Sequence, residues 1–421
     1  MTLDFLTKGI GIPRRKLFAI TILNAGTLSW YMLISHNNFG NMFHNFSNQS
    51  SWIWIGTALF YFFAAFSAIV GVIFSRRISG MKLLWAWTVF GVITTGMVLF
   101  FKGEAFILIF GPLLGISLGL GFPYSLSLIA NCTKSEQRGR VSGILIFETF
   151  FMLILVGGIV TELNLDATGT VAALIVLRSM SFLALATYKT SACNKPLDET
   201  TSVSRINTRE INRTFLMYFI PWILFIVAIV LTENIIWPTL RQNTGISLLL
   251  DKDPFHYVGT AIFALVSGSI ADRFGRKIPT VIGLTLLGSG LILIGTFVSP
   301  ESVFIHLMAI GIAFGFLMVI YTTIPGDLSE TNNVEKFYAL IVVLPLTIYG
   351  GLGALPSIWG ANATANFLSP FLAFIMFASS VPVLLAKETL KEDKIAERRM
   401  KEHIEKVYKL VQESEEKPQK K

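Results

Sequence analysis

The sequence predicts an all-α membrane protein whose chain crosses the bilayer twelve times, in two six-helix repeats. Three observations predict this fold class. Hydrophobic residues make up 53% of the chain and charged residues only 14%, against about 25% charged residues in soluble domains. The apolar residues gather into twelve runs, each close to the roughly 20 residues that a helix needs to span the hydrocarbon core. Lysines and arginines fall mainly in alternate gaps between these runs.

The predicted spans form two sets of six. The first set is Leu17–Ser35, Trp52–Phe74, Leu83–Phe101, Ala105–Ala130, Val141–Thr161 and Gly169–Tyr188. The second set is Thr214–Ile236, Phe255–Ile270, Pro279–Val298, Ser302–Pro325, Phe337–Ile358 and Phe367–Ala386. We therefore predict an N-terminal bundle over residues 1–188, a cytoplasmic central loop over 189–213, a C-terminal bundle over 214–386 and a charged tail over 387–421.

The positions of lysine and arginine predict the orientation of the chain, because loops rich in these residues stay in the cytoplasm. With the N-terminus inside, 30 of the 34 Lys and Arg residues lie in cytoplasmic segments. Both termini are thus predicted to be cytoplasmic, in a protein of the plasma membrane. The formal net charge of +8 follows from the same rule, so we infer no nucleic-acid partner from it. The tail has apolar residues spaced by three or four, which predicts a helix that is either membrane-bound or solvated.

Two pairs of short segments indicate that the chain repeats itself. The segment GVIFSRRISG (Gly71–Gly80) stands between the second and third spans, and GSIADRFGRK (Gly268–Lys277) stands 197 residues later, between the eighth and ninth. The segment GISLG (Gly115–Gly119) stands in the fourth span, and GIAFG (Gly311–Gly315) stands 196 residues later, in the tenth. Because the two offsets agree within one residue, we infer equivalent six-helix halves.

These features together resemble the major facilitator superfamily, and the resemblance covers nearly the whole chain. Its signature pattern G-x-x-x-D-R-x-G-R-K is carried by Gly268, Asp272, Arg273, Gly275, Arg276 and Lys277. The segments EQRGR (Glu136–Arg140) and KETL (Lys387–Leu390) agree with it. The resemblance implies parallel halves, a central cavity between them and a rocking mechanism of transport.

The resemblance also implies that the signature loop docks on the start of the fifth span, near Arg140–Gly143. There the carboxylate of Asp272 could accept hydrogen bonds from helix N-terminal amides, with Arg138 and Arg140 as charge partners. Such contacts exist only while the cytoplasmic side is closed, so we predict a gate lock that favours the outward-open state. Retention of basic loops in the cytoplasm explains the arginines of this loop equally well, but it does not explain Asp272.

Two further expectations concern this predicted lock. We expect Arg276 to pair with Asp327 and Glu330, at the inner end of the tenth span. The copy of the loop in the first half is degenerate, because Ser75, Ile78 and Ser79 replace the residues equivalent to Asp272, Gly275 and Arg276. We therefore predict a single principal lock, in the second half.

Polar residues within the spans are candidates for the substrate or proton pathway, because ionisable groups are costly in the bilayer. The candidates are Asn24, Tyr31, Tyr124, Glu148, Arg178, Glu233, Asn234, His306 and Tyr321. Glu148 and Arg178 either form a structural ion pair or act separately, Glu148 as a coupling-proton site and Arg178 as a holder of an anionic group. Glu233 lies either at a wet rim or in the binding site. His306 either titrates near neutral pH or is a hydrogen-bonded interfacial histidine.

The sequence thus predicts a secondary active or facilitative transporter of a small organic solute, working by rocker-switch alternating access. No phosphate-binding motif G-x-x-x-x-G-K-[ST] is present in the sequence. We predict no enzyme activity, no cofactor and no metal site. The expected partners are the lipid bilayer and the solute, with protons as a candidate coupling ion, and the protein is expected to be monomeric. The alternative is a non-transporting sensor of the same fold that signals through its tail.

Overall fold

The computed structural model describes residues 10–35, 50–101, 103–188, 208–244, 254–329, 334–352 and 365–390, together with residues 400, 404, 407 and 408. The helices before the central loop are α2 (Arg14–Leu33), α4 (Ser50–Arg77), α5 (Gly80–Met97), the 3₁₀ turn η2 (Glu104–Phe106), α6 (Ile107–Gly119), α7 (Phe122–Cys132), α8 (Ser135–Glu162) and α9 (Ala167–Thr187). Those after it are α10 (Thr208–Leu231), the π-helical turn η3 (Thr232–Ile236), α11 (Trp237–Thr244), α13 (Pro254–Phe274), α14 (Lys277–Thr296), α15 (Pro300–Leu328), α16 (Val334–Leu352) and α18 (Ala365–Leu385). Over these described residues the all-α prediction is confirmed.

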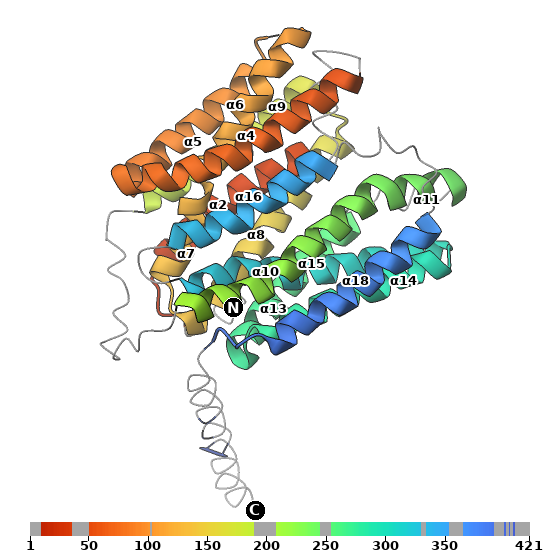
Figure 1. Ribbon diagram of the computed structural model, residues 1–421. Coiled ribbons are helices and arrows are strands. Elements are labelled where there is room, and N and C mark those ends of the chain that lie inside the picture. The colour runs from red at the N-terminus through yellow and green to blue at the C-terminus, as the bar shows by residue number, and fades with distance from the viewer. Residues whose placement is uncertain are drawn as a thin grey trace, which may run out of the picture.

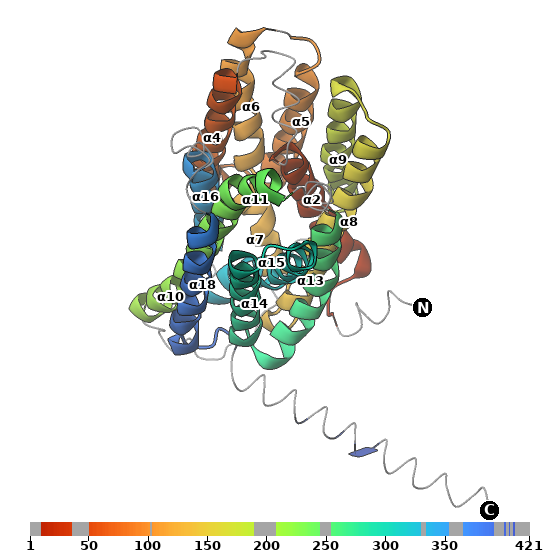
Figure 2. The same ribbon diagram turned by 90° about the vertical axis from the view of Figure 1, so that its right-hand side faces the viewer.

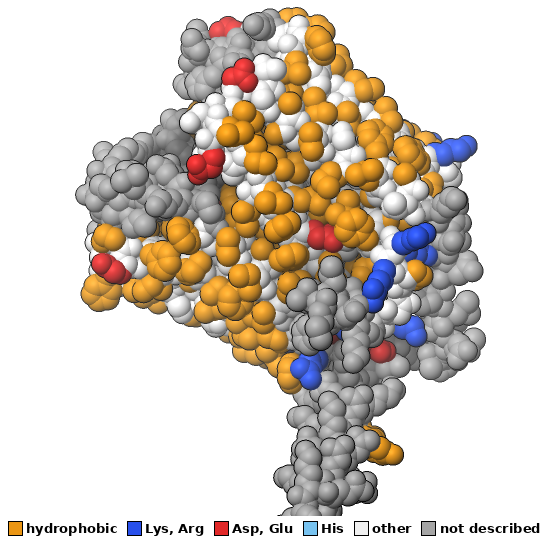
Figure 3. Space-filling model, turned by 180° about the vertical axis from the view of Figure 1, so that it is seen from behind, with side chains coloured by type: hydrophobic (Ala, Val, Ile, Leu, Met, Phe, Trp, Pro, Cys, Tyr) orange, Lys and Arg blue, Asp and Glu red, His pale blue; other side chains and the backbone are white. Residues whose placement is uncertain are grey.

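The protein is a membrane protein by the length and composition of its helices. Among the described residues, nine helices are long and apolar enough to cross a bilayer. The helices α2, α5 and α13 occupy the three remaining predicted positions, with 20, 18 and 21 residues. Figure 3 shows hydrophobic side chains spread over much of the described part of one face, while its Lys and Arg side chains lie toward the right-hand and lower edge. Such a surface suits contact with lipid tails.

The two halves of the chain pack side by side, as two views at right angles show (Figures 1 and 2). The helices α4, α5, α6 and α9 lie on one side, and α10, α13, α14 and α18 lie on the other. Contacts between α8 and α13, and between α4 and α16, join the two halves. These two seams position the residues discussed below.

The internal repeat of the sequence reappears as a repeated helix contact. A Cβ atom on Gly115 of α6 would collide with the carbonyl oxygen of Phe60 in α4. A Cβ atom on Gly311 of α15 would lie 2.5 Å from the carbonyl oxygen of His256 in α13. His256 follows Phe60 by the same 196 residues that separate the two glycines. The absence of side chains at these glycines allows each helix pair to approach closely.

Two predicted spans are not simple helices. The span predicted over Ala105–Ala130 is divided into η2, α6 and α7, with a break before Phe122. Gly121 stands at this break, where a Cβ atom would collide with the indole ring of Trp87. The seventh span continues through η3 into α11, beyond its predicted end. Because Pro238 has no amide hydrogen to donate within the helix, a wider π turn just before it is a physically reasonable adjustment.

Candidate functional site

A carboxylate near the end of α13 bonds directly to the backbone of α8. Asp272, only 2% exposed, accepts hydrogen bonds from the amides of Gly139 at 2.9 Å and Arg140 at 3.0 Å. The Nε of Arg140 also donates to it, at 3.2 Å. A Cβ atom on Gly268 would lie 2.5 Å from the Gly139 carbonyl oxygen. The two glycines therefore permit the close approach that brings Asp272 onto these amides.

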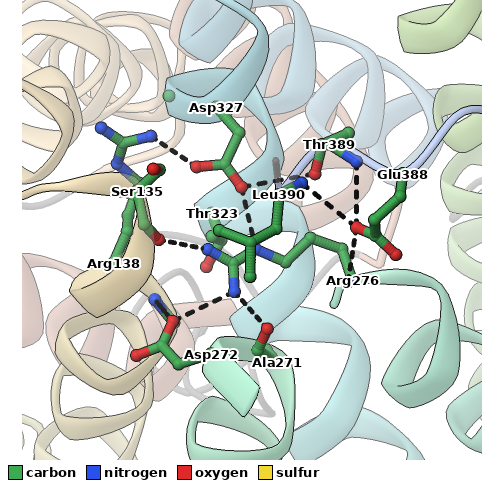
Figure 4. Close-up of polar contacts among 12 residues, drawn as sticks. Ser135, Arg138, Ala271, Asp272, Arg276, Thr323, Asp327, Glu388, Thr389 and Leu390 are labelled. Atoms are coloured by element: carbon green, nitrogen blue, oxygen red, sulfur yellow. Dashed lines mark hydrogen bonds and ion pairs between the residues drawn. The ribbon is translucent and has the colours of Figure 1, made fainter. Parts of the chain in front are cut away.

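The second charged group of the loop is the guanidinium of Arg276, which is fully buried. Its Nε donates to Asp327 at 2.8 Å, and its Nη1 donates to Asp272 at 3.0 Å and to the carbonyl of Ala271 (Figure 4). Its Nη2 donates to the carbonyl of Ser135 at 2.6 Å. Burial lowers the pKa of Arg276, but the charges of Asp327 and Asp272 outweigh it and hold that pKa above its ordinary value. The guanidinium therefore remains charged.

The two arginines of α8 have different partners, which corrects one prediction. Arg140 pairs with Asp272 as expected, whereas Arg138 pairs with Asp327 at the end of α15. Residues two positions apart on a helix differ by roughly 200° in direction, so these two side chains cannot easily reach the same carboxylate. The predicted pairing of Arg276 with Asp327 is formed. Glu330 lies outside the described residues.

These five side chains form one buried ionic network, which we call the lock cluster: Arg138, Arg140, Asp272, Arg276 and Asp327. It joins α8 of the first half to α13 and α15 of the second half. Removal of one partner from a buried ion pair is strongly destabilising, by roughly 3–5 kcal/mol, because the other charge is left uncompensated. The lock cluster can therefore hold this end of the two halves together.

Glu388 is a site residue that the sequence analysis missed. Its carboxylate accepts the amide of Arg276 at 2.8 Å and the amide of Lys277 at 3.2 Å, where α14 begins. Gly275 precedes this helix start with a φ of +96°, and a Cβ atom there would collide with the Glu388 carboxylate. Helix N-terminal amides lack partners within the helix and attract carboxylates. The segment KETL was the available signal, but only contacts 112 residues apart in sequence reveal this cap.

The remaining loop residues play smaller parts. The Nζ of Lys277 donates to the carbonyl of Leu384 at 3.2 Å, and Arg273 is exposed. In the first-half copy of the loop, the hydroxyl of Ser75 donates to the carbonyl of Val72 in its own helix at 2.9 Å. Among the described residues, no hydrogen bond joins Ser75 to the other half as Asp272 is joined to Gly139 and Arg140.

A cavity of about 530 Å³ lies between the halves, lined by residues of α2, α4, α10, η3, α15 and α16 among others. The start of α2 is at the lock end, because the amide of Gly11 donates to Gln137 of α8 at 3.0 Å. The cavity is lined instead by Tyr31 and Ser35, toward the far end of this helix. The cavity thus lies toward the end opposite the lock cluster. Its volume is in the usual range for small-molecule sites.

Four of the predicted pathway residues line this cavity, and five do not. Those that line it are Tyr31, Glu233, Asn234 and Tyr321. Glu233 and Asn234 belong to the π-helical turn η3 and are partly buried where they line the cavity. The other five are Asn24, Tyr124, Glu148, Arg178 and His306.

Arg178 is buried inside the first half and is not paired with Glu148, which corrects the ion-pair interpretation. Its Nη1 donates to the hydroxyl of Thr27, and its Nη2 donates to the carbonyl of Ser117 at 2.8 Å. Its guanidinium carbon lies 5.4 Å from the ring centroid of Trp30 and 4.3 Å from that of Trp87. Arg178 is therefore stabilised by carbonyl and hydroxyl dipoles and by two aromatic faces.

Glu148 lies near Thr21 on α2, whose hydroxyl donates to the carbonyls of Leu17 and Phe18. Asn24 and Ser125 bond to each other, since Asn24 Nδ2 donates to the Ser125 carbonyl at 3.1 Å and Ser125 Oγ donates to Asn24 Oδ1 at 2.8 Å. Tyr124 is partly buried, with its hydroxyl close to Gly80 at the start of α5.

His306 is fully buried and accepts a hydrogen bond from the indole of Trp237 at 3.4 Å. The histidine is therefore hydrogen-bonded, as one of its two interpretations expects, but it is enclosed by the protein and does not reach the surface. Trp237 itself lines the cavity, so His306 supports a lining residue from behind. Among the described residues, no group of three or more His, Cys, Asp and Glu side chains could hold a metal ion.

Comparisons with known proteins agree with this architecture. No protein-family model matches the chain. Multidrug resistance protein 1 of Bacillus subtilis (strain 168) is 29% identical over 165 residues, and the match covers 34% of this chain and 42% of that protein. The chain therefore matches less than half the length of this curated relative.

Two solved structures match over nearly their full length. The crystal structure of the human organic anion transporter MFSD10 (TETRAN) superposes with a TM-score of 0.65 at 11% identity, covering 88% of this chain and 99% of that chain. The structure of the MFS (major facilitator superfamily) proton:xylose symporter XylE bound to 6-bromo-6-deoxy-D-glucose has a TM-score of 0.65 at 16% identity, covering 89% of this chain and 96% of that chain. With helices repeated at an offset of 196 residues and a cavity between the halves, the chain has the fold of the major facilitator superfamily.

Proposed function

We propose that the chain is a secondary active or facilitative transporter that moves a small organic solute by alternating access. The observation that supports this most is the combination of a buried lock cluster at one end of the halves with a cavity toward the other end. Opening the lock end would require the contacts of Asp272 with Gly139 and Arg140 to break. The two solved structures are of transporters, and the curated relative is named a multidrug resistance protein, which together favour transport here.

The orientation belongs to the same proposal. We place the lock cluster at the cytoplasmic face and both termini in the cytoplasm of a plasma-membrane protein, because lysine and arginine are concentrated on that side. The structure then corresponds to an outward-open state. Asp272 acts as the principal lock, since Ser75 at the equivalent place bonds within its own helix in the part of the chain that the structure describes.

A ligand screen followed by flux tests the proposal. Thermal unfolding of the purified protein is measured against a library of metabolites and drugs, because a ligand that prefers the native state raises its stability. Each stabilising compound is then tested for uptake into liposomes that contain the protein. Saturable flux that is slowed in Asp272→Asn supports transport. If compounds stabilise the protein but none of them is taken up into the liposomes, the proposal is contradicted.

Proton coupling is a finer part of the proposal. Glu148 is a carboxylate within a span, next to Thr21 rather than a basic residue. In a proton symporter, flux driven by a pH gradient would be lost in Glu148→Gln while exchange without a gradient continued. If flux is the same with and without the pH gradient, the chain is a uniporter.

A sensor that signals through its tail is the second candidate, and one contact favours it. Thr389, at the start of the tail, donates to Asp327 of the lock cluster at 3.4 Å. A chain shortened after Leu390 keeps this contact and removes the rest of the tail. If ligand-dependent stabilisation persists without flux, and the shortened chain loses signalling in cells, the sensor is the better explanation.

A further inference from the structure

The charge of the cavity is one-sided. Among the described residues that line it, Glu233 is the only Asp, Glu, Lys or Arg. Eleven of the 28 lining residues are Phe, Trp or Tyr. A pocket of this kind offers one negative charge and many aromatic faces, which themselves carry partial negative charge. The ligand that it suits therefore differs from an anion and from a polyol.

Three tyrosines line the same cavity as Glu233. The ring of Tyr61 in α4 stacks on that of Tyr349 in α16, with centroids 5.8 Å apart and planes at 18°. Tyr31 of α2 meets Tyr61 edge to face at 6.4 Å. Glu233 is close enough to interact electrostatically with all three side chains. The site thus combines a carboxylate with aromatic rings contributed by both halves.

A second pair of aromatic rings lines the same cavity. The rings of Trp222 in α10 and Tyr321 in α15 are 4.3 Å apart between centroids, tilted by 32°. Apolar side chains of α2, α4 and α16 complete the lining. Pockets of this composition take ligands with large apolar parts, and a few polar groups orient them. Hydrophobic substituents of a ligand would pack here.

Arg178, the arginine within the spans of the first half, does not offset the negative charge of Glu233 in the cavity. Arg178 is absent from the lining, and its guanidinium is held between Trp30 and Trp87. An anionic ligand would face Glu233 at low dielectric, where like charges repel strongly. A cation would be attracted both by the carboxylate and by the aromatic faces.

We infer that the cavity binds an organic cation with hydrophobic substituents, such as a quaternary ammonium or phosphonium, held by Glu233 and the tyrosines Tyr31, Tyr61 and Tyr349. This inference rests on the proposed transport function, since the same cavity is its substrate site. It goes beyond that function by assigning the charge and the chemical class of the ligand.

Binding of two probes of equal shape and opposite charge tests the inference. Tetraphenylphosphonium and tetraphenylborate are titrated onto the full-length protein in phosphatidylcholine nanodiscs, with empty nanodiscs as the blank, and tryptophan fluorescence reports binding. We expect saturable binding of tetraphenylphosphonium, weakened roughly tenfold or more in Glu233→Gln because a direct charge contact is lost. Equal affinity for tetraphenylborate, or unchanged affinity in Glu233→Gln, would overturn the inference.

Matched variants distinguish the effects of the carboxylate charge and of the aromatic ring from a loss of folding. Glu162→Gln removes an exposed carboxylate at the end of α8 that does not line the cavity, and we expect no change in its affinity. Tyr349→Phe keeps the ring and should bind within about twofold of the parent, whereas Tyr349→Leu should bind several-fold more weakly. Each variant must also elute as a single species and unfold at the temperature of the parent protein.

Failure of the ligand class can be told apart from failure of transport. A cysteine placed at Ala271, which is fully buried in the lock interface, reports opening of the lock end through its reaction with a membrane-impermeant maleimide. If a neutral or anionic solute changes the reactivity of this cysteine and tetraphenylphosphonium does not, the inferred ligand class is wrong while the proposed transport is still supported. If the cysteine never reacts under any condition, alternating access itself is contradicted.

Discussion

The carboxylate of Asp272 accepts the main-chain amide of Gly139 at 2.9 Å, so a charged side chain of one half ends on the backbone of the other. The same carboxylate accepts the amide of Arg140 and a hydrogen bond from the guanidinium of Arg276. All of these donors are N–H groups. A side chain at this position must therefore supply two acceptor oxygens. The chemistry of the lock cluster thus requires an acid at residue 272.

Asp272→Asn should open the lock end more often. The amide side chain keeps one acceptor oxygen, but its own N–H₂ group would face the donors that the second carboxylate oxygen now satisfies. A loss of about 1.4 kcal/mol changes the equilibrium tenfold, so we expect Ala271→Cys to react with maleimide at least several-fold faster. Both native cysteines, Cys132 and Cys193, are replaced by serine in the parent for this measurement.

Asp166→Asn is the control for this experiment. Asp166 also accepts one main-chain amide, that of Gly169 at 2.8 Å, but it caps α9 just beyond the end of α8, whereas Arg138 and Arg140 stand at the start of α8. Its replacement should leave the reactivity of Ala271→Cys unchanged. Equal labelling rates in Asp272→Asn and the parent would show that Asp272 is not the principal lock.

Arg276→Lys should destabilise the protein even though the charge is kept. The guanidinium bonds at once to Asp327, Asp272 and the carbonyl of Ser135. One ammonium group cannot reach all of these from a single position. We expect a loss of roughly 2–4 kcal/mol in the free energy of unfolding, measured as a lower midpoint of thermal unfolding. Lys277→Arg is the control, because the Lys277 side chain makes one exposed contact with a carbonyl. Similar midpoints for both variants would contradict the prediction.

Gly275→Ala should destabilise the turn between α13 and α14. Gly275 has a φ of +96°, and an added methyl group would collide with the carboxylate of Glu388. We expect a loss of about 1–3 kcal/mol, together with weaker capping of α14. Gly158→Ala is the matched control, because no atom lies within 4 Å of a Cβ atom built there, in the helix α8. That change should be neutral or stabilising by up to about 1 kcal/mol, and an equal loss in both variants would show that strain at Gly275 is not the cause.

The fold followed from the sequence because lipid imposes simple rules on it. Apolar runs of span length must become helices, since each backbone amide needs a partner inside the bilayer. Repeated glycines such as Gly115 and Gly311 then marked where two helices approach. Hydropathy did not predict the break before Phe122 or the π turn at Thr232–Ile236, although a proline stands close to each, Pro123 and Pro238. Hydropathy does not register a local change of hydrogen-bond pattern.

The candidate site was predictable only where a motif was present. The loop pattern around Asp272 and Arg276 located most of the lock cluster, although it assigned Arg138 to the wrong acid. Polarity alone was a poor guide to the cavity, since His306 and Arg178 are polar residues packed within single halves. Which side of a helix faces the other half depends on crossing geometry, and this is not encoded in any local run of residues.

Arg178→Lys tests whether this buried guanidinium holds the end of α6 in place. The carbonyl of Ser117 is in the last turn of α6, and Arg178 satisfies it while also bonding Thr27 of α2. A lysine would keep the charge but lose the planar group that stacks on Trp87. We expect a loss of roughly 2–4 kcal/mol of stability and a changed tryptophan emission spectrum, while Arg77→Lys, on the exposed end of α4, changes neither. An unaltered emission spectrum with full stability in Arg178→Lys would mean that a positive charge of any shape suffices at this position.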